Sequence, residues 1–187
     1  MHRNAPHNKS SLADAQLEPF RHYFKRTSVP AHTVLLREGM VSRKAWFIEK
    51  GCIRLWFNNQ GKDITFQFFF ENEGVSSIES FETKTPSLFN IETLEPCILH
   101  ELKQKDFQTM RTESTAFNDL INATILRRMV YYQQLFLSRI KDNPQQRYAA
   151  LVNDHPHIVQ RVPQHYIASY LGITPVSLSR IRNKRNS

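Results

Sequence analysis

Residues 162–185 read VPQHYIASYLGITPVSLSRIRNKR, and this stretch predicts two short helices joined by a tight turn. Ile167 and Leu171 are four residues apart, which is the spacing of one apolar helix face. Gly172 follows, at the point where a left-handed backbone conformation ends a helix. The Thr-Pro pair at 174–175 then supplies an N-cap and a proline suited to the first helical position. The stretch therefore predicts a helix-turn-helix.

The second predicted helix carries polar and cationic side chains. In a helix-turn-helix this helix enters the major groove of DNA. Arg180 is the candidate for bidentate reading of a guanine edge, whereas Arg182 suits a phosphate. An ordinary two-helix corner with a solvated basic tail is the alternative interpretation. The predicted DNA contacts are Gln164, Thr174, Val176, Ser177, Ser179, Arg180, Arg182, Asn183, Lys184 and Arg185.

The net charge of this 187-residue chain is +8, and all of it lies in the last third. Residues 1–119 contain fifteen lysines and arginines and fifteen acidic residues, so they are neutral. Residues 120–187 contain ten lysines and arginines against Asp142 and Asp154. A neutral front and a basic back predict a sensor or scaffold domain followed by a domain that binds a polyanion.

Between residues 33 and 102 the sequence has the pattern of β-structure. Apolar runs rich in aromatic and β-branched residues are separated by turn residues, which predicts short strands in a β-barrel or jelly roll. A helical segment over 12–26 is expected to precede them. The predicted strands cover 34–36, 45–49, 53–57, 64–70, 88–93 and 98–102.

Residues 107–142 contain no glycine or proline and predict one long helix. Its apolar seam exceeds what a barrel and a small domain would cover, so we expect it to pair with a second copy in a parallel homodimer. Packing of this helix on the barrel alone is the alternative. The seam comprises Phe117, Leu120, Ile121, Thr124, Ile125, Arg128, Tyr132, Leu135, and either Phe136 or Leu137.

Several functional classes are not favoured by the sequence. No run of 18 apolar residues or signal peptide is present, so a cytoplasmic protein without membrane contact is expected. Cys52 and Cys97 are predicted to be buried free thiols, with no zinc or iron–sulfur site. His32 and His100 are the only histidines in or near the predicted strands, and we expect neither haem binding nor an enzyme of the cupin type. No catalytic residue and no metal site are predicted.

A barrel, a long helix, a proline hinge and a helix-turn-helix, in this order, resemble the Crp/Fnr family of dimeric bacterial transcription regulators. The resemblance covers residues 12–185, and residues 161–182 are similar to the variant common in Bacteroidetes. It implies an α+β chain that binds a DNA palindrome as a homodimer, with RNA polymerase as a further candidate partner. The implied domains are a cyclic-nucleotide-binding-like effector domain (12–106), a dimerisation helix (107–142) and a helix-turn-helix domain (144–187).

The sequence departs from the family at the nucleotide cassette. Ser76 and Ser77 occupy the positions of its Gly-Glu pair, and Ser87 and Leu88 those of its Arg-Ser pair. A buried cyclic phosphate requires a cation or several donors, and no arginine lies between residues 54 and 111. We therefore expect cyclic AMP binding to be weak or absent and predict no cofactor.

Two interpretations of this effector region remain open: a barrel filled with aromatic side chains, or an apolar effector bound where the nucleotide would sit. The candidate pocket comprises Phe66, Phe68, Ser76, Ser77, Glu79, Ser87, Leu88 and Phe89, with Phe66 and Phe68 expected on one strand face. In the predicted DNA-reading helix, Pro175 and Val176 replace the Arg and Glu frequent in the family, so a different half-site is expected, with Val176 against a thymine methyl. A protein-interaction adaptor with a degenerate helix-turn-helix is the alternative function.

Overall fold

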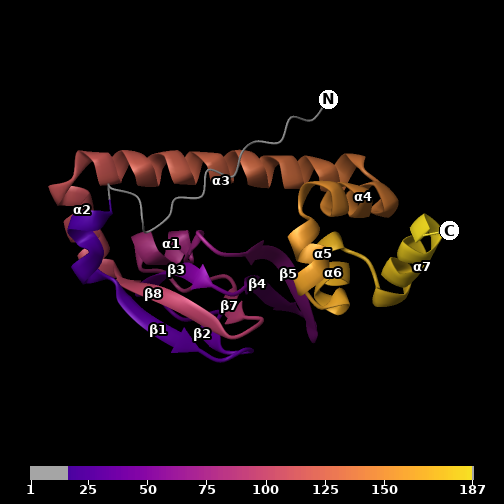
Figure 1. The fold of residues 1–187 in the computed structure, drawn as a ribbon, viewed down its shortest axis with the longest axis horizontal. Coiled ribbons are helices and arrows are strands. Elements are labelled where there is room, and N and C mark those ends of the chain that lie inside the picture. The colour runs from indigo at the N-terminus through magenta and orange to yellow at the C-terminus, as the bar shows by residue number, and fades with distance from the viewer. Residues whose placement is uncertain (1–16, 187) are drawn as a thin grey trace.

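The structure, a computed structural model, describes residues 17–186; for Glu18, Arg185 and Asn186 it describes the backbone alone. A β-sandwich lies at one end and a group of short helices at the other, and a long helix runs along both (Figure 1). The predicted α+β class, with a jelly roll followed by a helical C-terminal part, is confirmed. No helix within 17–186 has the length and apolarity to cross a membrane.

The sandwich consists of two four-stranded antiparallel sheets. Their inner faces meet in a core that contains Ile48, Ile53, Ile91 and Leu99, all fully buried. One sheet has the strand order β1 (Lys25–Val29), β8 (Cys97–Lys103), β3 (Lys44–Lys50), β6 (Gly74–Val75). The other has the order β2 (Val34–Leu36), β7 (Asn90–Thr93), β4 (Ile53–Asn59), β5 (Lys62–Phe69).

All six predicted strands are present, and two strands and a helix were not predicted. The prediction of a helix over 12–26 is wrong beyond Tyr23. A 3₁₀ helix spans Glu18–Tyr23, and β1 begins at Lys25 because Lys25–Val29 pairs with β8. Residues 12–16 lie outside the described part. The strand β6 and the helix α1 (Ile78–Thr83) are too short to leave a periodic signal.

A β-bulge in β5 divides the predicted aromatic face. Leu55 pairs with Gln67 and the next residue pairs with Thr65, so Phe66 is the extra residue. Phe66 therefore turns to the inside of the sandwich, whereas Phe68 lies on the outer face, 5.3 Å from the ring of Tyr170. The expectation that both line one face is wrong, because the bulge shifts the alternation by one residue.

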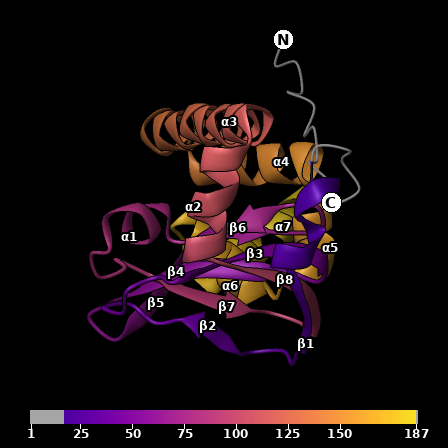
Figure 2. The same ribbon diagram turned by 90° about the vertical axis from the view of Figure 1, so that its left-hand side faces the viewer.

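The helix predicted over 107–142 is two helices, α2 (Gln104–Glu113) and α3 (Thr115–Lys141). Ser114 breaks them and caps α3, with its side chain accepting the Phe117 N–H at 3.1 Å. α2 rises from the sandwich to α3 (Figure 2). The buried side chains of Phe107 and Met110 anchor α2 in the core cluster at this end of the sandwich. The predicted dimer helix is therefore limited to α3.

The predicted seam on α3 mixes two faces of the helix. Phe117, Leu120 and Leu135 face this chain's own body, whereas Ile125 and Tyr132 are exposed. A second apolar face points away from the body. We call it the outer stripe, and its members are Leu126, Met129, Val130, Phe136, Leu137 and Ile140, exposed by 40–66%.

The C-terminal helices share one core with the outer face of a sheet. This cluster joins Tyr148, Ile167 and Leu178 to Phe68 and Phe70. Asn143 and Gln146 form a capping box at the first of these helices. The helices are α4 (Pro144–Asp154), α5 (Pro156–Arg161), α6 (Gln164–Leu171) and α7 (Pro175–Asn186).

Candidate DNA-binding surface and effector site

The predicted two helices and turn are present as α6, Gly172 and α7. Gly172 adopts a φ of 68°, and its N–H donates to the carbonyls of the last turn of α6. Ile173 donates to the Ala168 carbonyl at 2.9 Å, which completes the helix end. Thr174 accepts the Ser177 N–H at 3.1 Å, as expected of an N-cap.

One face of α7 is exposed, and it brings together several of the predicted DNA contacts. Leu178 (1% exposed) anchors the opposite face in the core. Val176, Ser179, Arg180 and Asn183 are spaced by three or four residues and lie on the exposed face. The remaining predicted contacts differ in exposure: Gln164, Thr174 and Lys184 are exposed, Ser177 and Arg182 are half-buried, and the Arg185 side chain lies outside the described part.

Two arginines of the basic C-terminal third bind carbonyls at the end of α6. Arg139 donates to the Tyr170 carbonyl, and Arg147 donates to the Leu171 carbonyl at 3.0 Å and to the Asp142 carbonyl at 2.6 Å. They satisfy carbonyls at the end of α6 that have no helical partner. A Cβ at Gly172 would lie 2.8 Å from Arg139 Nη1, so another residue at this position would require the end of the Arg139 side chain to shift. Charge counting alone could not separate these cations from DNA ligands.

α6 packs directly on strand β5 of the sandwich (Figure 1). The Ser169 hydroxyl accepts the Thr65 N–H at 2.9 Å and donates to the Asp63 carbonyl at 3.0 Å. The ring contact of Phe68 with Tyr170 lies in the same interface. The two-helix unit is therefore held on the sandwich by both polar and apolar contacts.

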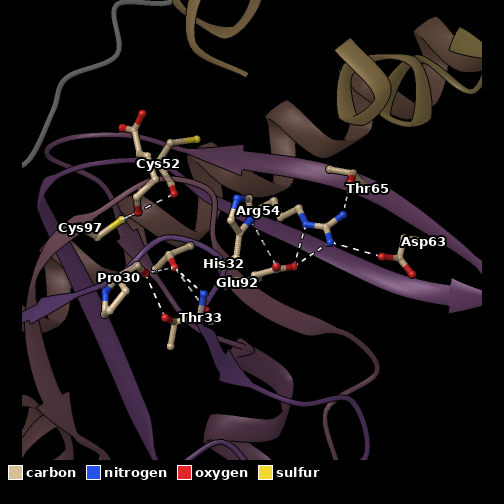
Figure 3. Close-up of polar contacts among 11 residues, drawn as sticks. Pro30, His32, Thr33, Cys52, Arg54, Asp63, Thr65, Glu92 and Cys97 are labelled. Atoms are coloured by element: carbon tan, nitrogen blue, oxygen red, sulfur yellow. Dashed lines mark hydrogen bonds and ion pairs between the residues drawn. The ribbon is translucent and has the colours of Figure 1, made fainter. Parts of the chain in front are cut away.

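A buried ionic cluster lies beneath α6, centred on Arg54 (Figure 3). The Arg54 guanidinium is 2.7 Å and 2.9 Å from Glu92 Oε2, and 3.2 Å from the Thr65 hydroxyl. It also lies 4.1 Å from the ring centroid of Tyr166 on α6. Arg54 is only 2% exposed. An arginine inside an apolar strand was the available signal in the sequence, and the sequence reasoning missed it.

Arg161 makes a second ionic link between the helices and the sandwich. Its guanidinium bonds both Glu71 oxygens, at 2.7 Å and 2.8 Å, and also pairs with Glu95. The hydrogen bonds from Arg161 lower the pKa of Glu71 to about 2. Because a lowered carboxyl pKa stabilises the fold only while the group is ionised, this stabilisation is present above about pH 4.5 and is lost as the pH falls towards 2.

Arg161→Gln is therefore expected to lower the free energy of unfolding at pH 7 by about 1 kcal/mol, since the pair is partly exposed. The difference from the parent protein should shrink below pH 4.5 and disappear near pH 2. Urea unfolding across this pH range measures it. Lys50→Gln is the control, because Lys50 has no carboxylate partner among the described residues. A deficit of Arg161→Gln that stays constant with pH would contradict the assignment.

At the positions of the nucleotide cassette, serine hydroxyls form hydrogen bonds with each other. Ser77 and Ser87 are buried, and their hydroxyls lie 2.9 Å apart. The Ser87 hydroxyl is also 2.8 Å from the Phe89 carbonyl. Glu79 and Leu88 are exposed. Of the predicted pocket, the structure brings together Ser77, Ser87, Phe66 and Phe89, the last two in an edge contact at 5.2 Å; Ser76 is half-buried.

A cation does enter the space between the sandwich and α3, but from the helix. Arg128 donates to the Gly74 carbonyl, and its guanidinium lies 4.9 Å from the ring centroid of Phe69. Burial lowers the pKa of Arg128. The prediction that Arg128 belongs to the dimer seam is wrong, because its side chain points towards the sandwich of its own chain.

Both cysteines are free and buried, as predicted (Figure 3). Burial raises the pKa of Cys52 far above its ordinary value and that of Cys97 to about 11. Both thiols are therefore protonated and unreactive at neutral pH. Nowhere in residues 17–186 do three or more histidine, cysteine, aspartate or glutamate side chains come together as a metal site.

Comparison with known proteins places the fold. Residues 26–114 match the model of the cyclic nucleotide-binding domain family, and no curated protein matches the chain in sequence. The c-di-GMP-responsive global regulator CLP of Xanthomonas campestris is similar with a TM-score of 0.73 at 16% identity, over 91% of this chain and 90% of that one. FixK2 from Bradyrhizobium japonicum gives 0.74 at 12% identity, over 86% and 83%.

A third solved structure, of a regulator described as Crp/Fnr-type from Eubacterium rectale, gives a TM-score of 0.70 at 15% identity. It covers 92% of this chain and 83% of that one. Similarity at this level of identity concerns the fold. Residues 26–114 are thus similar to the cyclic nucleotide-binding domain family, and the chain has the fold of these solved regulators, as its sequence resemblance predicts.

Proposed function

We propose that this protein is a transcription regulator that binds duplex DNA as a homodimer, with α7 in the major groove. The observation that carries the proposal is the exposed face of α7, on which Val176, Ser179 and Arg180 stand beside one another above a buried Leu178. Such a face presents an arginine and a methyl-bearing side chain to base edges. Lys184 adds charge for the phosphates.

The outer stripe of α3 supports the dimer. Met129 and Phe136 are seven residues apart, as are Val130 and Leu137, and Leu126 and Ile140 are fourteen apart, with the exposed Gln133 midway between them. This spacing suits a left-handed pair of helices, with the polar Gln133 setting the register. An apolar face of this length on one helix is costly in water unless a second copy covers it.

The proposal is tested by Arg180→Ala with a duplex that the parent protein selects from random sequences. We expect the dissociation constant to rise about 10- to 100-fold, corresponding to the loss of one base-reading arginine, about 1–3 kcal/mol. Parental affinity should also fall steeply with salt. Lys50→Ala, which removes an exposed cation from the sandwich, should bind as the parent does. If the parent selects no duplex at all, the adaptor function replaces this one.

We also propose that cyclic AMP is not the effector. The buried Ser77–Ser87 pair offers no cation to a phosphate, and Arg128 is already engaged with Gly74 and Phe69. Calorimetric titration with cyclic AMP up to about 1 mM, the weak end of specific binding, should give no saturable heat. A saturable isotherm of one nucleotide per protomer would contradict this proposal and leave the DNA-binding one intact.

A further inference from the structure

A cavity of about 900 Å³ lies at the edge of the sandwich, and no residue of the nucleotide cassette lines it. It opens between the inner face of β1, β3 and β8 and the segment formed by β2 and residues 37–43. β1 and β2 lie on the side of the sandwich opposite α3 (Figure 2). The volume is that of a small-molecule site, for which about 300–1,000 Å³ is usual.

Its walls are mostly apolar. Leu36, Trp46 and Leu99 are buried side chains that reach its floor, and Met40, 60% exposed, lies on its lining loop. None of Ser76, Ser77, Ser87 and the other predicted pocket residues lines it. The predicted effector pocket and this cavity are therefore different places.

The polar groups of the cavity carry an excess of positive charge. Lys44 is paired with Glu101 at 3.0 Å. Arg37 and Arg43 are exposed lining residues, and their guanidinium groups have no hydrogen-bond or ion-pair partner in the described part of the chain. An apolar space with two uncommitted guanidinium groups complements a molecule that is apolar along its body and anionic at one end.

We infer that this cavity binds an apolar molecule carrying one carboxylate, with the carboxylate at Arg37 and Arg43 and the apolar body against Leu36, Trp46 and Leu99. The nucleotide positions are not involved. Binding is an equilibrium property of the sandwich and does not depend on DNA.

Hydrogen bonds from backbone N–H groups connect the cavity lining to Ser87 of the nucleotide cassette and to α1. Gly39 donates to the Ser87 carbonyl at 2.8 Å, and Ser87 donates to the Met40 carbonyl at 2.9 Å. Ser42 donates to the Ser80 hydroxyl of α1 at 2.8 Å. Phe81 of α1 then meets Phe107 of α2 in an edge contact at 5.2 Å. α2 leads directly into α3, the helix of the proposed dimer, so a carboxylate at the cavity is placed to alter DNA affinity. This consequence rests on the proposed function.

The test is calorimetric titration of the full chain with octanoate and, in parallel, with uncharged 1-octanol. We expect one octanoate per protomer, bound at least about ten-fold more tightly than 1-octanol. The double variant Arg37→Gln with Arg43→Gln should abolish that preference while 1-octanol binding stays unchanged. Thr27→Phe, which fills the cavity from β1, should remove both ligands. Lys50→Gln, an exposed cation outside the lining, should behave as the parent does.

Absence of saturable octanoate binding by the parent overturns the inference, as does equal binding of octanoate and 1-octanol. Retained octanoate binding in both the double variant and Thr27→Phe, with cooperative urea unfolding of each, also overturns it. Arg180→Ala should bind octanoate as the parent does. The octanoate titration contains no DNA, so a failure of the proposed ligand binding can be distinguished from a failure of the proposed DNA binding.

Discussion

Replacing both Met129 and Phe136 with glutamate is expected to convert the protein from a dimer to a monomer. These side chains are 59% and 64% exposed on the outer stripe. In a dimer they would be buried, and an unpaired carboxylate buried against apolar side chains costs several kcal/mol. Because the two DNA-binding units would no longer be joined, affinity for a palindromic duplex should fall at least about 100-fold.

Sedimentation equilibrium measures the mass, and a fluorescence-anisotropy titration measures the DNA affinity. Gln134→Glu is the matched control, because it places the same acidic side chain on an exposed position of α3 outside the outer stripe. It should remain a dimer and bind DNA as the parent does. A dimer that survives the double substitution would place the interface elsewhere than the outer stripe.

Arg54→Met is expected to lower the free energy of unfolding by about 3–5 kcal/mol, the largest effect of any single substitution considered. Glu92 is 7% exposed and would lose its cation. Tyr166 on α6 would lose its cation–π contact in the same variant. Urea unfolding monitored by circular dichroism measures the loss.

Two further variants separate the buried charge from the loss of side-chain volume. Adding Glu92→Leu to Arg54→Met should recover most of the stability, since neither charge then remains unpaired. Arg26→Met should cost no more than about 1 kcal/mol, because Arg26 pairs with Glu49 at 2.8 Å on the surface. Equal costs for Arg54→Met and Arg26→Met would show that the cluster contributes no more than a surface ion pair.

Elements whose signals lie within a few residues were predictable. Gly172, Thr174 and Pro175 mark the turn before α7, and each takes the predicted backbone role. The strands β3, β4 and β8 were predicted within two residues at either end. In both cases neighbouring residues alone determine the preferred backbone conformation.

The bulge at Phe66 was not predictable in the same way. Nothing near Phe66 in the sequence shows that Leu55 and the residue after it pair with residues two apart on β5. Register is a relation between strands, so it depends on the partner's packing. The split of the aromatic residues into an inner and an outer set follows from it.

The basic C-terminal third shows the same division most clearly. The sequence by itself determined where the charge lies, where the turn before α7 falls and which residues α7 exposes. Only the tertiary structure decided that four of these arginines bind groups of the protein itself. Arg128, Arg139 and Arg147 donate to backbone carbonyls, Arg128 also contacts an aromatic ring, and Arg161 pairs with carboxylates. The physical reason is the length of the arginine side chain, which can bind any acceptor that the fold brings near it. Because most of these acceptors are distant along the chain, the local sequence does not reveal them.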